Sequence, residues 1–300
     1  MMASRGRQHK VIDPRIWVIF LPGFLFVVLF TFYPMGKMLV MSFFDWNIGY
    51  NQTSPYVGLD NYVRVLTDPI ARTAMTNTFA YAFVTVPLQM VLGLCVALLI
   101  HGISRLSVFY RVGYYLPVIT SWVVVALLFR YIFSNAGLLN YVLTDILSIT
   151  EDHIGWLSSR WSALSAAMLL GIWKGIGWNM VIFLAALQAV PKTLYEAADM
   201  DGANRRQRFF HITLPGIRGT VMFVSVMLMI GAFNTFTPIT VLTNGNPAHQ
   251  TEVVLTWMYF KTFDALDMGY SAALSMIITA IIVLFTVLIF YVLRRKGEGA

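Results

Sequence analysis

Six long apolar stretches, separated by shorter polar segments, dominate the pattern along the chain. Each stretch is long enough to cross the hydrocarbon core of a bilayer as a helix, which takes roughly 20 residues. The stretches lie at residues 16–41, 79–100, 112–133, 163–190, 220–242 and 270–293. The pattern predicts an all-α, polytopic membrane protein with about six transmembrane helices.

The composition agrees with this prediction. Hydrophobic residues make up 58% of the 300 residues and charged residues only 12%, which is far from the composition of an ordinary soluble domain. The first apolar stretch is too long for a signal peptide and lacks a small-residue cleavage site. We therefore expect it to remain in the protein as a membrane anchor, preceded by a cytoplasmic tail at residues 1–15.

Basic residues are distributed unequally between the two sides of the membrane. They gather at residues 5–15, 105–111, 192–218 and 294–296, whereas most acidic residues fall in the other loops. Because Lys and Arg mark cytoplasmic loops, both termini and the segment between the fourth and fifth stretches are predicted to be cytoplasmic. The net charge of +7 is then explained by membrane topology and not by nucleic-acid binding.

The largest predicted cytoplasmic loop, residues 191–218, contains the sequence LYEAADMDGANRRQRFFHITLP. We expect two short helices in it, the first opened by a capping box of Thr193 and Glu196. Gly202 is expected to end that helix in the left-handed conformation, and Asp201 or Asn204 to cap the second. The residues alone suit either a hairpin lying on anionic headgroups or a docking element for a cytoplasmic protein.

The spacing within this loop resembles the EAA motif of binding-protein-dependent ABC importer permeases. In such permeases the loop is a coupling helix that sits in a groove of the ATP-hydrolysing subunit. Arg206 and Gly219 depart from the usual pattern, which has an aromatic residue and a proline there. The resemblance implies an ATPase-coupling role for Glu196, Ala197, Ala198, Asp201, Gly202, Ala203, Arg205 and Phe209.

Further stretches make the resemblance more specific, to the carbohydrate-uptake branch that includes maltose and glycerol-phosphate permeases. They lie at residues 57–62, 116–117, 137–140, 184–191 and 269–273. The resemblance implies a type I ABC importer permease architecture for residues 16–300, in the bacterial plasma (inner) membrane. It also implies a second permease in a heterodimer, two ATPase subunits that bind ATP and Mg, and an extracytoplasmic solute-binding protein.

The fourth stretch carries small residues and a lysine. Gly171 and Gly175 have the spacing that lets two membrane helices approach closely, and Gly177 is expected to loosen the helix nearby. Lys174 should face a water-filled path, an acid or backbone carbonyls, unless its side chain reaches up to the outer surface.

Aromatic and amide side chains suit a sugar path, because rings stack on sugar faces and amides bond to hydroxyls. For any single aromatic residue, ordinary helix packing is the alternative. The candidates for the solute path are Trp122, Trp173, Lys174, Trp178, Phe233, Asn234 and Phe236.

We find no sequence motif for catalysis, for phosphate binding or for a metal site. The predicted function is a non-catalytic, cofactor-free permease subunit of an ATP-driven importer, with a di- or oligosaccharide as the favoured solute. One alternative is an ion-coupled secondary transporter, which would need acidic residues or broken helices at mid-membrane. The other is an ABC permease for a non-sugar solute such as glycerol phosphate, since Arg130 and Lys174 leave an anionic solute open.

Overall fold

The computed structural model describes residues 14–47, 53–103 and 105–295. Five helical segments within them are long and apolar enough to cross a membrane, namely Phe20–Met41, Pro69–His101, Arg160–Ala189, Arg218–Leu242 and Met268–Tyr291. A sixth consists of two helices, Ser107–Ile119 and Trp122–Ile132, which meet at 91°. The predicted spans are all present, but the third is sharply bent. The N-terminal tail lies mostly outside the described residues.

The first half of the chain supplies the first three spans. The first comprises α1 (Pro14–Val27), the π-helical turn η1 (Val28–Phe32) and α2 (Tyr33–Met41). A short helix, α3 (Asp60–Thr67), then leads into the long α4 (Pro69–His101). The bent span is α5 (Ser107–Ile119) followed by α6 (Trp122–Ile132), and α7 (Leu138–Tyr141) with η2 (Val142–Ile146) lies beyond it.

The second half begins with α8 (Arg160–Ala189). The cytoplasmic loop then forms α9 (Lys192–Met200), α10 (Arg205–Arg208), η3 (Phe209–Thr213) and α11 (Leu214–Gly216). The last two spans comprise α12 (Arg218–Phe233) with α13 (Thr237–Leu242), and α15 (Met268–Arg295), with α14 (Val254–Phe263) between them.

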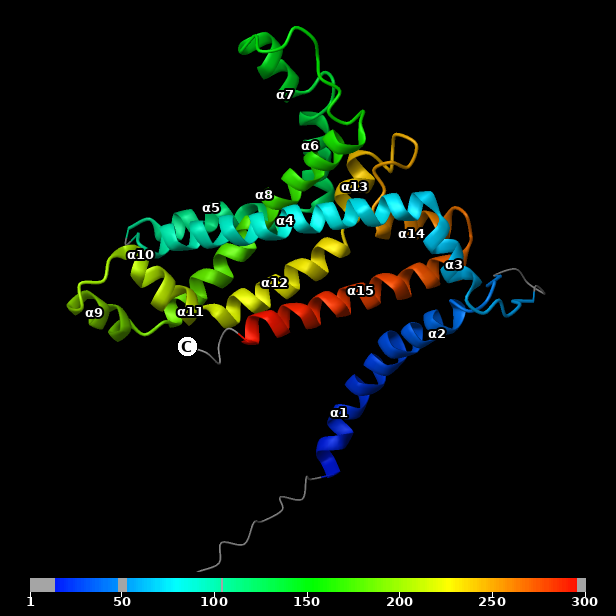
Figure 1. The fold of residues 1–300 in the computed structure, drawn as a ribbon, viewed down its shortest axis with the longest axis horizontal. Coiled ribbons are helices and arrows are strands. Elements are labelled where there is room, and N and C mark those ends of the chain that lie inside the picture. Colours follow the sequence, from blue (N-terminus) through cyan, green and yellow to red (C-terminus); the bar gives the residue numbers. More distant parts are fainter. Residues whose placement is uncertain (1–13, 48–52, 104, 296–300) are drawn as a thin grey trace, which may run out of the picture.

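The helices α4, α12 and α15 run along the long direction of the molecule, and α8 crosses behind α4 (Figure 1). At one end lie α9, α10, α11 and the end of α15, and at the opposite end lie α3 and α14. The first end therefore carries three of the basic segments that the sequence predicts to be cytoplasmic, as far as the structure describes them: residues 105–111, 192–218 and 294–295. The first span extends away from this bundle (Figure 1), and none of its apolar window is buried within the chain.

Glycines let α4, α5 and α8 approach one another closely. A Cβ atom at Gly171 would lie 2.2 Å from the Tyr81 hydroxyl, and one at Gly175 would lie 2.0 Å from the Gln89 amide oxygen. The predicted close approach at these two glycines is confirmed. Gly177 does not loosen α8, which continues to Ala189; instead, a Cβ there would lie 2.0 Å from the backbone oxygen of Tyr114 in α5.

Candidate functional sites

The first helix of the cytoplasmic loop starts two residues earlier than the expected cap at Thr193 implies. Helix α9 begins at Lys192, with Pro191 at the capping position and no side-chain cap. The expected capping box of Thr193 and Glu196 is therefore wrong, because Thr193 already lies inside the helix. Proline has no N–H and a fixed φ angle, so Pro191 itself separates α8 from α9.

The turn after α9 follows the prediction. Gly202 adopts a left-handed φ of +71°, and the Ala203 N–H donates to the carbonyl of Ala198 at 2.9 Å, which closes the helix end. Asn204 caps α10 by accepting from the N–H of Gln207 at 3.0 Å, while the Gln207 side chain accepts from the Asn204 N–H at 2.8 Å. Asn204, and not Asp201, is thus the cap of the second helix.

Two side-chain contacts fix the two halves of the loop to each other. The hydroxyls of Tyr195 in α9 and Thr213 in η3 are 3.0 Å apart. Arg208 in α10 forms an ion pair with Asp199 near the end of α9. The loop is thereby a structured helical hairpin.

The residues with a predicted coupling role occupy one exposed end of the molecule. Most of them are exposed, and only Ala198, Ala203 and Phe209 are half-buried. Met200, between them, is 89% exposed. Contact with an ATPase stays a prediction.

A cavity of about 380 Å³ lies between the membrane helices, and we call it the central cavity. Helices α4, α6, α8, α12 and α13 and the break between α12 and α13 contribute its walls. The lining residues are Tyr81, Thr85, Gln89, Trp122, Gly171, Gly175, Met227, Leu228, Gly231, Ala232, Asn234, Thr235, Phe236, Thr237 and Pro238.

Three of the predicted solute-path residues line this cavity, namely Trp122, Asn234 and Phe236. Trp122 follows the bend at the start of α6, and the other two occupy the break after α12. Their contact with a solute stays a prediction.

The other predicted aromatic residues do not line the central cavity. Phe233 is only 2% exposed and packs against the rings of Phe79 and Phe285. Trp178 packs against an apolar cluster at the other end of α8, and Trp173 contacts Phe129 with ring centres 5.8 Å apart. In the single chain these three contact other rings or apolar side chains, and their contact with a solute stays a prediction.

Sequence reasoning missed the polar wall that α4 contributes. Tyr81, Thr85 and Gln89 all line the cavity, and they lie four residues apart, which places them on one face of a helix. A repeat of polar residues every fourth position within an apolar stretch is a signal that could have identified them.

Lys174 lies behind the cavity wall and its side chain is directed at the bend between α5 and α6. Its ammonium donates to the backbone oxygens of Pro117 at 2.6 Å and Thr120 at 2.7 Å. Lys174 is only 3% exposed, so its side chain does not reach the outer surface. Of the partners expected for it, namely water, an acid or backbone carbonyls, it has the carbonyls. The charge also complements the negative end of the α5 dipole. Arg130 is exposed and does not line the cavity.

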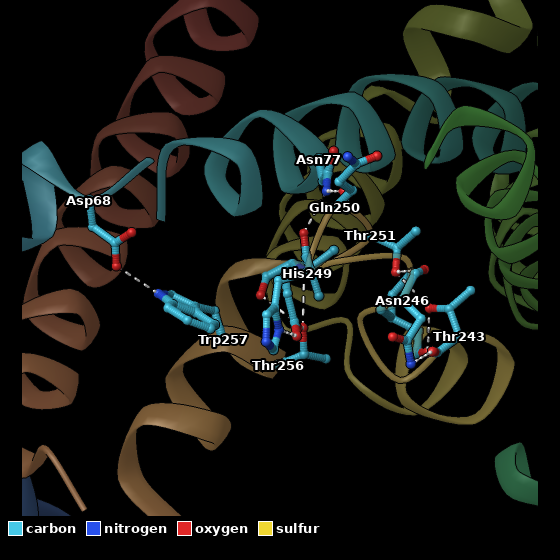
Figure 2. A network of polar contacts seen from close by, with 12 residues as sticks. Asp68, Asn77, Thr243, Asn246, His249, Gln250, Thr251, Thr256 and Trp257 are labelled. Atoms are coloured by element: carbon cyan, nitrogen blue, oxygen red, sulfur yellow. Dashed lines mark hydrogen bonds and ion pairs between the residues drawn. The ribbon is translucent and has the colours of Figure 1, made fainter. Parts of the chain in front are cut away.

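A polar network joins α4 and α8 to the loop between α13 and α14 (Figure 2). The Asn77 amide donates to the carbonyls of Gln250 at 2.8 Å and Glu252 at 2.6 Å, and accepts from Arg160 at 2.8 Å. His249 lies 2.9 Å from the Glu252 carboxylate, which also accepts from the Thr256 hydroxyl. These bonds hold the loop against the bundle.

Asp68 forms the N-cap of α4 and lies beside the same network (Figure 2). Its carboxylate accepts from the hydroxyl of Tyr270 at 2.6 Å and from the indole of Trp257 at 3.3 Å. Burial alone would raise the pKa of Asp68, but hydrogen bonds from Tyr270, from the backbone N–H groups of Ile70 and Ala71 and from Trp257 outweigh burial and lower this pKa. The carboxylate is thus held in its charged form.

A second cavity, of about 310 Å³, lies between α13, α14 and the loop that joins them, and we call it the outer pocket. Phe236 lines both this pocket and the central cavity. The lining residues are Phe236, Thr240, Asn244, Gly245, Asn246, His249, Glu252, Thr256, Tyr259, Phe260 and Asp264.

Residues 76–297 match the family described as "Binding-protein-dependent transport system inner membrane component". The chain is 33% identical over 290 residues to the arabinooligosaccharides transport system permease protein AraP of Halalkalibacterium halodurans, covering 94% of this chain and 89% of the relative. It is 32% identical over 312 residues to the diacetylchitobiose uptake system permease protein NgcF of Streptomyces coelicolor, covering 99% of this chain and 88% of the relative.

A crystal structure of a bacterial ABC transporter involved in the import of the acidic polysaccharide alginate has a chain with the same fold. The TM-score is 0.82 at 23% identity, and the match covers 94% of this chain and 96% of that chain.

Proposed function

Because the chain belongs to the family of binding-protein-dependent transport system inner membrane components, we propose that it forms half of the path through which an ATP-driven importer takes up a sugar. Membership makes it a permease subunit of an ABC importer in the inner membrane, one that works with a solute-binding protein. Membership of this family also excludes an ion-coupled secondary transporter as the preferred function. The observation that supports the path most directly is the central cavity with its ring and amide walls.

The cytoplasmic loop is the proposed contact with the ATPase. The hydroxyl contact of Tyr195 with Thr213 and the ion pair of Asp199 with Arg208 hold the hairpin together. A displacement of α9 would therefore move the whole loop as a rigid body. Only Val190 and Pro191 separate α9 from α8, and α8 carries two glycines of the cavity wall. Closure of the ATPase dimer would thus be transmitted to the cavity, which would switch between inward-open and outward-open states by a rigid-body movement.

The remaining subunits and cofactors are also part of the proposal. This chain itself performs no covalent chemistry, and two ATPase subunits bind the ATP and Mg²⁺. A second permease completes the path in a heterodimer. In support, Trp122 at the cavity wall is 43% exposed in the single chain, and Gly231 and Asn234 are exposed as well, as expected of a surface that a second subunit covers.

The proposed solute is a di- or oligosaccharide. Support comes from relatives whose names refer to arabinooligosaccharides and diacetylchitobiose and from cavity side chains that can stack on sugar rings and bond to hydroxyls. The alternative solute is glycerol phosphate, which is anionic, whereas most di- and oligosaccharides are uncharged.

Crosslinking tests the coupling role. Ala198 is replaced by cysteine in a chain whose single cysteine, Cys95, is replaced by serine, and the ATPase subunit carries single cysteines around its groove. We expect crosslinks whose yield changes when ATP is added. As a control, Tyr56→Cys places an equally reactive thiol on the opposite end of the molecule and should give none.

Either of two results would contradict the proposal. One is an Ala198→Cys variant that crosslinks no better than Tyr56→Cys. The other is solute movement by the purified chain alone, driven by an ion gradient.

A further inference from the structure

We propose that the outer pocket is a second solute subsite, which holds a sugar residue of an uncharged glycan next to the central cavity and repels anionic solutes. This inference rests on the proposed function, and it chooses between its two candidate solutes. Four features of the described residues support it: a shared aromatic wall, a fixed polar rim, the signs of the charges and the exposed ring faces.

The shared wall makes the two cavities neighbours on one route. The Phe236 ring lines both, and it contacts the ring of Tyr259 with centres 5.2 Å apart. A solute that leaves the outer pocket toward the central cavity has to pass this aromatic pair. The volume of about 310 Å³ lies at the lower end of the range for small-molecule sites, about 300–1,000 Å³.

The polar rim of the outer pocket is fixed in place. Glu252 is 4% exposed, and its two carboxylate oxygens are held by Thr256 and His249. Gly245 has a left-handed φ of +81°, and a Cβ there would lie 2.1 Å from the Glu252 carboxylate. Groups that are held in position before binding lose less entropy when a ligand arrives.

Carboxylates outnumber bases along this route, since His249 is the one basic side chain among the described residues that line the outer pocket. Glu252 and Asp264 line the outer pocket, whereas the central cavity is lined by uncharged side chains. Over the described part of the chain, no Lys or Arg lines either cavity.

Neighbouring cations are engaged elsewhere. Arg160 donates to the amide oxygen of Asn77 at 2.8 Å. The Lys174 ammonium donates to backbone carbonyls behind the wall. The Lys261 ammonium lies over the rings of Trp257 and Tyr270, at 5.0 and 4.8 Å from their centres. A phosphate or uronate in the outer pocket would therefore meet two carboxylates, and the single imidazole of the described lining, that of His249, is already paired with Glu252. Sugar hydroxyls, in contrast, can donate to these carboxylates.

The remaining features suit a glycan. Tyr259 is 49% exposed and offers a ring face on which a sugar can stack, and Asn244 and Asn246 supply amides beside it. In the central cavity the exposed Asn234 supplies a further amide to which a sugar hydroxyl can bond.

Thiol modification measures the sign of the field in the pocket without knowledge of the solute. Thr240→Cys in the Cys95→Ser chain, within the assembled transporter, is treated with two methanethiosulfonates that differ only in carrying a trimethylammonium or a sulfonate group. After correction for the rates with a free thiol, we expect the cationic reagent to react about tenfold faster. Asp264→Asn should reduce this preference several-fold, and Asp152→Asn, an exposed acid elsewhere, should leave it unchanged.

A corrected ratio of the cationic to the anionic reaction rate near one would overturn the electrostatic part of the proposal. A ratio that Asp264→Asn does not alter would overturn it as well. Asn244→Cys serves as a second reporter in case Thr240→Cys does not assemble.

Binding of defined glycans tests the subsite itself. The assembled transporter in nanodiscs is titrated with the neutral maltotriose and with the anionic trigalacturonate, and contact is followed by saturation-transfer NMR. We expect contact with maltotriose alone, reduced at least threefold by Tyr259→Ala and hardly changed by Tyr56→Ala, a tyrosine outside the pocket.

The outcomes separate this inference from the function on which it rests. Contact with maltotriose that Tyr259→Ala leaves intact would overturn the outer subsite while the sugar permease stands. Preferential contact with trigalacturonate would overturn the charge selectivity. Contact with neither glycan, together with failure of the Ala198→Cys crosslinks, would overturn the sugar permease itself.

Discussion

The ammonium nitrogen of Lys174 lies 4.9 Å from the centre of the Trp122 ring, while the same ammonium donates to the backbone oxygens that end α5. A cation so placed over an aromatic face is attracted to it. One buried lysine thus fixes both the bend between α5 and α6 and the indole that forms a wall of the central cavity. Lys174 is therefore a positioning residue for the solute path, with no contact of its own to the cavity.

Replacing Lys174 should disturb both the fold and transport. Lys174→Met leaves buried carbonyls without a donor, and each unmet group costs about 1–3 kcal/mol, so we expect a clear drop in the unfolding temperature. Uptake should fall about tenfold or more, as Trp122 loses its support. The measurements are thermal unfolding in detergent and solute uptake in cells that express the whole transporter.

Two further variants make this prediction specific. Lys174→Arg keeps the charge and N–H donors and should recover part of the stability, whereas Lys192→Met, at an exposed lysine, should unfold at the wild-type temperature. Equal unfolding temperatures for Lys174→Met and the wild type would show that the bend does not depend on the lysine.

Adding one methyl group should have opposite effects at two glycines. Gly177→Ala places a Cβ 2.0 Å from a backbone oxygen of α5, and such overpacking costs about 1–3 kcal/mol. At Gly231, in α12, nothing lies within 4 Å of the added atom, and alanine favours a helix by up to about 1 kcal/mol. Thermal unfolding should therefore rank Gly177→Ala below the wild type and Gly231→Ala level with it or above it; the reverse order would contradict the packing described for α8.

The charged state of Asp68 should make stability depend on pH. Because hydrogen bonds lower its pKa in the folded protein, the carboxylate stabilises the fold at every pH above its unfolded value of about 4. This contribution is lost as the pH falls through the folded pKa. The difference in unfolding temperature between the wild type and Asp68→Asn should therefore be constant from pH 5 to pH 7 and shrink as the pH falls below about 4.

Asp152→Asn is the control for this pH series, since Asp152 is exposed and its removal should alter the unfolding temperature little at any pH. A difference between the wild type and Asp68→Asn that grows as the pH falls would contradict the assigned direction.

Gly202 should be required for the shape of the cytoplasmic loop but not for the bundle. Its φ of +71° costs a residue with a side chain roughly 1–2 kcal/mol, so Gly202→Val should disorder the turn after α9. We expect weaker crosslinking of Ala198→Cys to the ATPase and an unchanged unfolding temperature of the bundle. Gly219→Val is the matched control, because nothing lies within 4 Å of a Cβ at Gly219; equal loss of crosslinks in both variants would argue against a special role of the turn.

Hydropathy predicted the spans well but could not predict the bend in the third. Residues 112–133 are predominantly apolar, and a hydropathy pattern carries no information on the direction of a helix axis. The extended conformations of Thr120 and Ser121 depend on Lys174, which lies more than fifty residues away in the chain. Only the folded bundle brings that donor to the free carbonyls.

In the cytoplasmic loop, some of the helix caps predicted from neighbouring residues are present and one is not. Gly202 and Asn204 were predicted correctly because each acts within a few residues of itself. The capping box at Thr193 failed because Pro191 starts the helix first. In the solute path, aromatic type alone could not separate Trp122, on the cavity wall, from Phe233, in the packed interior.

The wall of the central cavity at Gly231 has a consequence for how such transporters diverge. Since a Cβ atom there would meet no other atom of the chain within 4 Å, an alanine at this position would narrow the cavity without displacing a helix. A single codon can therefore change the size of the accepted solute while the fold, the bend and the loop stay as they are. Gene duplication followed by substitution at such an open glycine would be a short route from one nutrient to another.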